Sequence, residues 1–275
     1  MRSPVTRRHA LIPLATFIVA ACGSTATPTP ASVSSPSPAT AVPAASVSTA
    51  SASRPAVDAS ASPSGAVAGS IDPANFVAAI DNPWFPLKPG TTFTYRGIKD
   101  GEKAVDTFAV TSDTRVVAGV TCVVVRDELT LAGALAEKTE DWYVQDRQGN
   151  VWYFGEATAE LDEAGKIVST EGSWETGVDG ARPGIFMPAD PAVGYSGAQE
   201  FYPGQAEDHF VVLLTDQTVK VPAGSYSGVL VTAEWTPLEP SVLSEKAYAK
   251  GIGEIREADV EGGDEKLELV TAAGL

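Results

Sequence analysis

Residues 135–161, LAEKTEDWYVQDRQGNVWYFGEATAEL, determine the fold class of this chain. Two runs rich in aromatic and β-branched residues flank Asp146–Asn150 (DRQGN), which fits a three-residue hairpin loop with Gly149 in the left-handed conformation. The stretch therefore predicts a β-hairpin with strands at 135–145 and 151–161.

The loop fixes the register of this hairpin. It pairs Asp146 with Asn150, Val144 with Trp152, Trp142 with Phe154 and Glu140 with Glu156 on one face, and it places Tyr143 opposite Tyr153 on the other. Two carboxylates that face each other repel, so one holds a proton, a cation such as Ca²⁺ bridges them, or both lean into water. The candidate ligand-binding residues are therefore Trp142, Trp152, Phe154, Glu140 and Glu156. The competing interpretation is a solvated hairpin end, and a shift of one residue would abolish the carboxylate pair.

Similar alternation extends along the rest of the chain after Gly90, with turn residues between the runs. Further strands are expected at 91–97, 105–117, 121–131, 167–174, 209–221, 228–235, 244–249, 253–261 and 266–270. Strands spaced this closely predict a mainly β domain, a single antiparallel, strongly curved sheet or half-barrel meander. The alternative is a two-sheet β-sandwich.

Two segments do not alternate. Residues 82–90 (NPWFPLKPG) contain three prolines, which predicts an extended path whose large side chains cover a sheet edge. Residues 177–206 hold many Gly and Pro, so we expect one long irregular loop packed by its own apolar side chains.

Several motifs resemble those of a family of uncharacterised secreted bacterial lipoproteins. They are NPWFPLKPGT (82–91), DWYVQD with GNVWYFGE (141–156), PGIFMPA (183–189), QEFY with AED (199–208) and YAKGIG (248–253). That family has no assigned activity, so the resemblance assigns no catalytic residue. The segment YAKGIGEI (248–255) is also similar to the last strands of curved-sheet lipoprotein carriers of the LolA and LppX type. This second resemblance implies an incurved sheet whose concave face holds an apolar ligand.

The N-terminus has the features of an export signal. Arg2, Arg7 and Arg8 precede the apolar run 10–21, which is too short for a stable membrane span. Residues 19–22 (VAAC) resemble the lipobox of bacterial lipoproteins, which implies that Cys22 is diacylated and becomes the mature N-terminus. The alternative is an ordinary cleaved signal with a chance cysteine. Residues 6–11 also resemble a twin-arginine signal, so the export route stays open.

Composition divides the chain into three parts: a lipoprotein signal peptide (1–21), an Ala/Ser/Thr/Pro-rich tether (22–70) and a β-rich extracytoplasmic domain (71–275). Within 23–70 the only charged residues are Arg54 and Asp58, and the segment lacks the apolar surface needed to offset its ordering entropy. We expect a disordered tether that holds the domain at the outer or periplasmic side of a cell membrane.

The formal net charge of the whole chain is −16. An acidic surface disfavours nucleic acid and anionic lipid headgroups, whereas it is compatible with cations or simply with solubility. The expected partners are the membrane, through the N-terminal lipid, and a lipid, a glycan or an envelope protein, with the domain itself a monomer.

Catalytic signatures give little guidance. Cys122 lies in a run of residues typical of a buried strand, which predicts that it is a small core residue. His209 is the domain's single histidine, and it follows Glu200, Glu207 and Asp208 closely enough to suggest a divalent-metal site, although the spacing matches no known signature. The candidate metal ligands are thus Glu140, Glu156, Glu207, Asp208 and His209, with Ca²⁺ as the candidate ion and no other cofactor expected.

The sequence favours a non-enzymatic domain that binds a ligand or an envelope component, and it assigns no catalytic residue. The alternative is a hydrolase of envelope glycans, which needs only two carboxylates. The separation and burial of the best carboxylate pair distinguishes the two.

Overall fold

The computed structural model describes residues 71–275. The expected signal peptide, the tether and the lipidated Cys22 lie outside the described residues. Within the described part, no helix has the length and apolar character needed to cross a membrane.

The described part is almost entirely β structure, with one short 3₁₀ helix, η1 (Pro73–Asn75), at its start. The first strands are β1 (Phe76–Val77), β2 (Thr92–Lys99), β3 (Glu102–Val117), β4 (Val120–Leu131), β5 (Ala134–Asp146), β6 (Val151–Leu161), β7 (Ile167–Ser169) and β8 (Trp174–Glu175). The remaining strands are β9 (Arg182–Met187), β10 (Ser196–Ala198), β11 (Glu200–Phe201), β12 (His209–Val221), β13 (Gly224–Trp235), β14 (Leu243–Ala249), β15 (Gly253–Glu261) and β16 (Lys266–Ala273).

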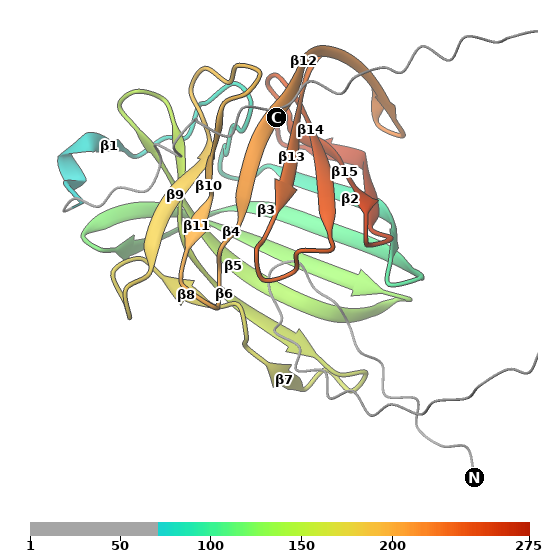
Figure 1. Cartoon of the computed structure of the whole chain (residues 1–275). Helices are drawn as coiled ribbons and strands as arrows, with labels where there is room; N and C mark the ends of the chain where they lie inside the picture. The colour runs from blue at the N-terminus through green and yellow to red at the C-terminus, as the bar shows by residue number, and fades with distance from the viewer. Residues whose placement is uncertain (1–70) are drawn as a thin grey trace, which may run out of the picture. The chain divides into compact units, whose positions relative to one another are not determined.

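Thirteen of these strands form one continuous antiparallel path in the order β10-β12-β13-β14-β15-β16-β2-β3-β4-β5-β6-β9-β11, and the short strands β1, β7 and β8 pair at its side. The path curls into a nearly closed barrel (Figure 1). The predicted single curved antiparallel sheet is therefore confirmed, and the two-sheet sandwich is not observed in residues 71–275.

The barrel has one seam, between the two ends of the path. The end strands β10 and β11 are consecutive in the chain, so Gln199 alone carries the backbone from one side of the seam to the other. Its N–H donates to the Asp208 carbonyl (2.7 Å). Gly184 of β9 lies so close to the Ala198 and Gln199 backbone that a β-carbon there would collide with both. Residues 177–206, expected to form one irregular loop, thus contain three short strands that make this seam.

The predicted hairpin is present, and its loop matches the expectation. The Asp146 N–H donates to the Asn150 carbonyl (2.9 Å), and Gly149 has a φ of 94°. The Asp146 carboxylate accepts from the backbone N–H groups of Gln148 and Asn150 and from the Trp152 indole. These bonds hold the loop rigid at one end of the barrel.

The proline-rich segment covers that same end rather than a sheet edge. Phe85 packs against Phe186 (ring centroids 4.5 Å apart) and Tyr143 (5.4 Å) inside the barrel. The Asn82 side chain fixes the segment by donating to the Gly149 carbonyl (2.8 Å). Large side chains of 82–90 therefore pack into the barrel interior at this end.

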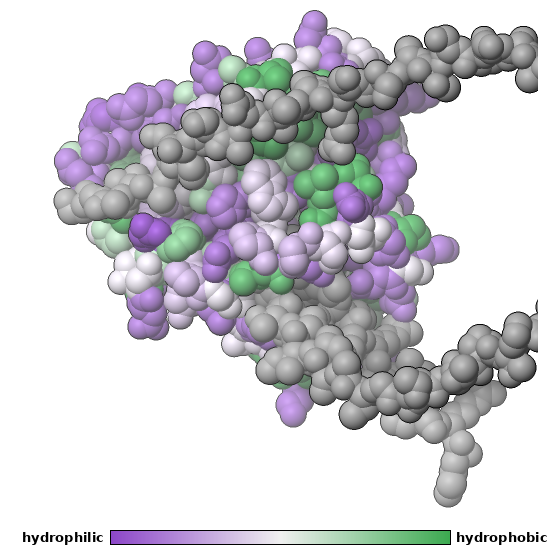
Figure 2. Space-filling view, viewed as in Figure 1, coloured by the Kyte–Doolittle hydropathy of each residue, from purple (hydrophilic) through white to green (hydrophobic). Residues whose placement is uncertain are grey.

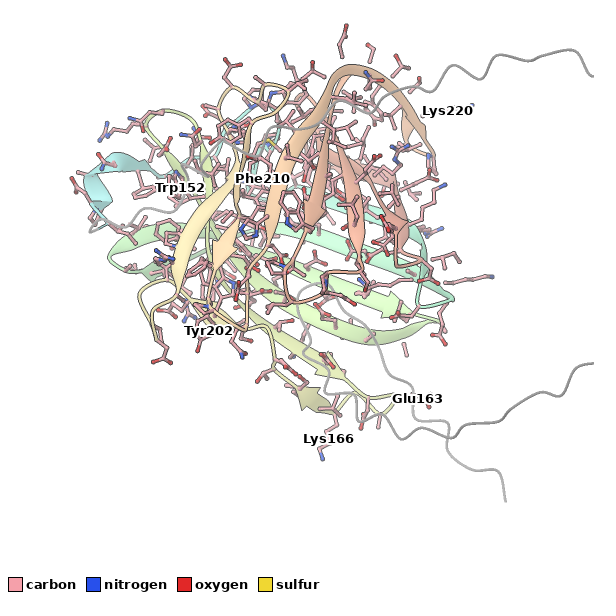
Figure 3. The ribbon with its side chains drawn as sticks, in the orientation of Figure 1. Trp152, Glu163, Lys166, Tyr202, Phe210 and Lys220 are labelled. Atoms are coloured by element: carbon pink, nitrogen blue, oxygen red, sulfur yellow. The ribbon has the colours of Figure 1, made fainter. Side chains whose placement is uncertain are left out.

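Two apolar clusters lie on opposite faces of the sheet. The larger one fills part of the interior and includes Phe210, labelled on β12 in Figure 3. The smaller one lies on the outer face of β4, β5, β6 and β9, where Phe76 packs edge-on against Phe154 (5.3 Å) and Trp152 (6.4 Å). Cys122 belongs to this outer cluster, buried and free, as its sequence context predicted. On the face shown in Figure 2, hydrophilic residues surround small apolar patches.

Candidate functional site

A cavity of about 220 Å³ lies inside the barrel and contacts nearly every strand of its wall. Aromatic rings line part of it: Phe85, Phe93, Tyr95, Phe108, Tyr143, Tyr153, Phe186 and Trp235. Carboxyl groups line much of the rest: Asp106, Asp127, Glu137, Asp141, Glu156, Glu200, Asp208, Glu234, Glu239, Glu254, Glu257 and Glu265. Among residues 71–275, only Lys99 and Lys246 contribute a basic side chain to the wall. An aromatic and strongly acidic interior is thus the main chemical feature of this domain.

Strand alternation brings the carboxyl groups inside. On β5, Glu137, Thr139, Asp141 and Tyr143 all line the cavity, whereas Trp142, between the last two, belongs to the outer cluster. Successive side chains of a strand point to opposite faces, so Glu137 and Asp141, which are four residues apart, lie on one wall together with Thr139 between them. The inner face of this strand is therefore polar along most of its length.

A bulge at Gly155 determines what Glu156 contacts. Tyr143 pairs with Tyr153 and Val144 with Trp152, as predicted, but Asp141 pairs with Glu156 because β6 contains one extra residue between the two positions. Gly155 has a φ of 135°, a conformation that favours glycine. The bulge changes the face on which the following residues lie, and it turns Glu156 into the cavity.

The expected Glu140–Glu156 pair is consequently wrong. Glu140 pairs with Ala157, and its carboxylate accepts a bond from Arg126 Nε (3.2 Å) at the surface. Trp142 and Phe154 lie in the outer cluster and are not direct partners, because the bulge separates them. Of the five residues predicted to bind a ligand, including Trp152 (Figure 3), only Glu156 lines the cavity.

The second predicted group is also dispersed. Glu200 and Asp208 line the cavity, but Glu207 caps the backbone N–H of Gly204 (2.7 Å). The His209 ring bonds the Glu207 carbonyl through Nδ1 (2.8 Å) and stacks on Trp235 (5.7 Å between centroids). Across residues 71–275, no three His, Cys, Asp or Glu side chains gather closely enough to hold a metal ion.

Glu156 and Glu200 are the most deeply buried acids of the wall, each 2% exposed. Burial raises the pKa of Glu156 well above its ordinary value, and the nearby carboxyls of Glu200 and Asp141 raise it further. Burial, and then Asp208, raises the pKa of Glu200 in the same way. The Trp174 indole lies close enough to offset part of the rise for Glu200, but no hydrogen bond of good geometry joins them.

Other carboxyls of the wall share this behaviour. Burial raises the pKa of Asp127, Asp141 and Asp208 to about 7 each. For Asp141 the rise occurs although its Oδ1 accepts a hydrogen bond from the Tyr153 hydroxyl (2.6 Å), which favours the charged form. Burial also raises the pKa of Asp106 well above its ordinary value, and Asp127 adds to this effect. Near neutral pH this wall therefore carries protons as well as charges.

The two lysines neutralise only part of the wall. Lys99 Nζ lies 2.6 Å from a Glu265 oxygen, and both side chains are 7% exposed. Lys246 Nζ lies 3.5 Å from Glu234 and Glu257, and 4.0 Å from Glu254. The carboxyls of Glu156, Glu200 and Asp208, near the seam, form no ion pair with a lysine or arginine of residues 71–275.

The inner acids of β5 were not predicted as site residues, although the sequence contains a signal for them. Within 135–145, Glu137 and Asp141 are four residues apart with Thr139 between them, which places these three polar side chains on one face of the strand. That pattern normally indicates the solvent side of a sheet. Only closure of the sheet around the acids turns this face into the inside of the molecule.

Comparisons with known proteins assign no family. No family model matches the chain, and no curated protein matches it. Among solved structures, a "putative exported protein with YmcC-like fold" from Bacteroides fragilis aligns at 16% identity with a TM-score of 0.41, covering 71% of this chain and 99% of that one. A "putative lipoprotein" from Parabacteroides distasonis aligns at 10% identity with a TM-score of 0.38, covering 70% and 99%. Likenesses this distant leave the cavity itself as the basis for inferring function.

Proposed function

We propose that this chain is a membrane-tethered, extracytoplasmic domain that binds a small ligand inside its barrel. The observation that carries the proposal is the cavity, whose wall is lined by aromatic faces and buried carboxyls. Ligand sites are typically enclosed, partly apolar and supplied with a few buried polar groups, and this interior has each of these properties.

The sequence supports the location. The VAAC stretch at 19–22 and the charge-poor segment 23–70 fit a lipid anchor on Cys22 followed by a flexible tether. As a flexible coil, such a tether would span roughly 35–40 Å root-mean-square. The domain would thus remain attached to the membrane while reaching ligands some distance away from it.

Native mass spectrometry of the protein purified from its own host tests the proposal. We expect a small molecule that stays bound in the folded state and is released on unfolding. In a Leu129→Trp variant the larger side chain fills the cavity and should remove the ligand, since Leu129 is part of the wall. Glu128→Trp adds the same side chain at an exposed neighbouring position and should retain the ligand. Wild-type protein that carries no ligand and binds none from host extracts would refute the proposal.

A second candidate, the hydrolysis of envelope glycans, is favoured by one observation. Asp141 and Glu156 are direct cross-strand partners, and burial raises both pKa values. Directly opposed residues have Cβ atoms about 5 Å apart, which is comparable with the carboxyl separation of retaining glycosidases. Release of reducing sugar from envelope polysaccharide, lost in Asp141→Asn and in Glu156→Gln, would support this candidate over simple binding.

A further inference from the structure

One part of the cavity wall shows how this barrel holds a buried ammonium group. Lys246 Nζ lies among three carboxylates, with Glu234 and Glu257 at 3.5 Å and Glu254 at 4.0 Å. Burial alone lowers the pKa of Lys246, but these carboxylates more than offset that effect and raise it well above its ordinary value. The surrounding carboxylates therefore stabilise an ammonium ion in the interior.

A second cluster, of three carboxyl groups, lies near the seam and has no lysine ammonium of the described residues beside it. Both Oε atoms of Glu200, Oε1 of Glu156 and Oδ1 of Asp208 are buried and receive no hydrogen bond of good geometry from residues 71–275. No ion pair with a lysine or arginine in that part of the chain reaches them either. A buried polar atom without a partner costs about 1–3 kcal/mol, so native structures seldom leave several of them together.

We infer that Glu156, Glu200 and Asp208 recognise the ammonium group of an organic amine, which takes the place that a lysine occupies at the other carboxylate cluster. This inference rests on the proposed function and names the class of ligand. We call these three residues the seam acids.

The composition of the wall favours an organic cation over a metal ion. The seam acids come from β6, from β11 and from the residue before β12, so three separate backbone segments supply them. An ammonium group donates three hydrogen bonds in different directions, which suits three separate carboxyls. Ca²⁺ instead needs six to eight oxygens within about 2.3–2.6 Å of one point.

The neighbouring aromatic rings suit the rest of such a ligand. Tyr143 and Tyr153 stack with centroids 4.8 Å apart, and Phe186 packs edge-on against Tyr143 at 5.2 Å. Aromatic faces bind alkyl and aryl groups and also attract cations. An apolar cavity of about 150 Å³ accommodates benzene, so the roughly 220 Å³ of this interior fits an amine with about six to eight carbon atoms.

Binding such an amine exchanges a proton for a cation. A neutral carboxylic acid of the wall loses its proton to solvent, and the resulting carboxylate pairs with the incoming R–NH₃⁺. Loss of the proton lowers the charge of the site by one and the bound ammonium raises it by one, so the net charge of the site stays the same. The charged and titratable groups that act on the seam acids from other strands are Glu137 and Asp141 of β5, Glu234 of β13, Lys246 of β14 and Glu257 of β15. Because burial and the acidic neighbours raise the pKa of the seam acids, these acids hold protons near neutral pH, and binding of the cation should release protons.

Isothermal titration calorimetry with matched probes tests the inference. The probes are hexan-1-amine and 2-phenylethylamine, with hexan-1-ol and hexanoate as neutral and anionic counterparts of similar size, and CaCl₂ as the metal alternative. We expect the amines to bind at least tenfold more tightly than the alcohol, and hexanoate not to bind. Titration in two buffers of different ionisation enthalpy should also detect protons released by the amine.

Two variants tie that binding to the seam acids. Glu200→Gln and Asp208→Asn keep the side-chain shape but remove charge, so each should weaken amine binding at least tenfold. Glu163→Gln makes the same type of change at an exposed turn (Figure 3) and should leave the affinity unchanged. Circular dichroism of each variant shows whether it is folded before titration.

The outcomes separate this inference from the proposed function. Equal binding of amine and alcohol, or amine binding that Glu200→Gln and Asp208→Asn leave intact, would overturn the inference while the cavity remained a ligand site. Tight Ca²⁺ binding that these two variants abolish would overturn it in favour of a metal. Failure of every probe, together with recovery of a non-amine from the host, would also overturn it, whereas complete absence of any ligand would remove the proposed function itself.

Discussion

Replacing Gly155 by alanine should destabilise the domain strongly, because two independent costs coincide at this position. The φ of 135° is unfavourable for any residue with a β-carbon, at about 1–2 kcal/mol. The new β-carbon would also collide with the Trp174 carbonyl and lie 3.0 Å from the Trp142 ring and from the Glu175 Cα. Strand β8 must therefore move away from β6.

That movement gives the larger part of the effect. It weakens the Gly155–Glu175 pairing and the hydrogen bond from the Thr176 N–H to the Phe154 carbonyl (3.0 Å), at about 1 kcal/mol each. Partial exposure of the Trp174 side chain, which is 4% exposed in the native domain, adds about 1–2 kcal/mol. The total is about 4–6 kcal/mol, or a fall in Tm of roughly 8–24 °C for a domain of this size.

Gly165→Ala is the matched control. Gly165 also has a positive φ, 76°, but a β-carbon there would meet no atom within 4 Å. It should cost only the conformational part, about 1 kcal/mol. Urea unfolding of both variants, followed by tryptophan fluorescence, measures the difference. Equal losses of stability would refute the argument that β8 packs tightly against the bulge.

Three further perturbations have defined outcomes. Burial raises the pKa of Asp127 to about 7 and of Glu254 to about 8, against about 4 in an unfolded chain. Between these pH values the folded domain binds more protons than the unfolded chain, so its stability should fall as the pH rises from about 4 to 8. A Tm that instead increases from pH 5 to pH 8 would contradict this. Lys246→Gln removes the ammonium from three carboxylates and should cost about 3–5 kcal/mol at pH 8 and less at pH 5, while Lys220→Gln, at the exposed end of β12 (Figure 3), should be neutral in chemical denaturation. Cys22→Ser should release the full-length protein from host membranes into the soluble or secreted fraction, and a variant that resists alkaline wash would exclude a lipid anchor.

The hairpin at 135–161 illustrates how far local sequence patterns predict this fold. Gly149 and Asp146 define a loop whose geometry fixes the neighbouring pairs, and the Tyr143–Tyr153 and Val144–Trp152 pairs follow from it. The prediction fails beyond Gly155, because a bulge is stabilised by a contact with β8, which comes later in the chain. A register can be extrapolated from a turn only as far as the next irregularity.

The seam and the candidate site were harder to predict for a related reason. A glycine is needed at position 184 of β9 because the Ala198 backbone approaches it closely. This contact joins β9 to β10, and the hydrophobic periodicity of each segment gives no information about which segments pair. Glu137 and Asp141 of β5 share a polar face of the kind that normally faces solvent, and they become interior only when β16 pairs with β2 and the sheet curls. Local propensity therefore predicted the strands, whereas closure of the barrel determined the environment of their side chains.

The position of β16 has a consequence for how the protein is made. Residues 266–273 lie in the middle of the sheet, between β15 and β2, with Ala273 paired to Thr92. At ribosomal rates of about 5–20 residues per second, β2 waits about 10–40 s for this partner to be synthesised. Until then the edge of β2 that pairs with β16 stays open, and the barrel cannot close. A chain with this topology should complete its folding late, after its last strand has been synthesised, and a factor that shields open strand edges during that interval should raise its yield.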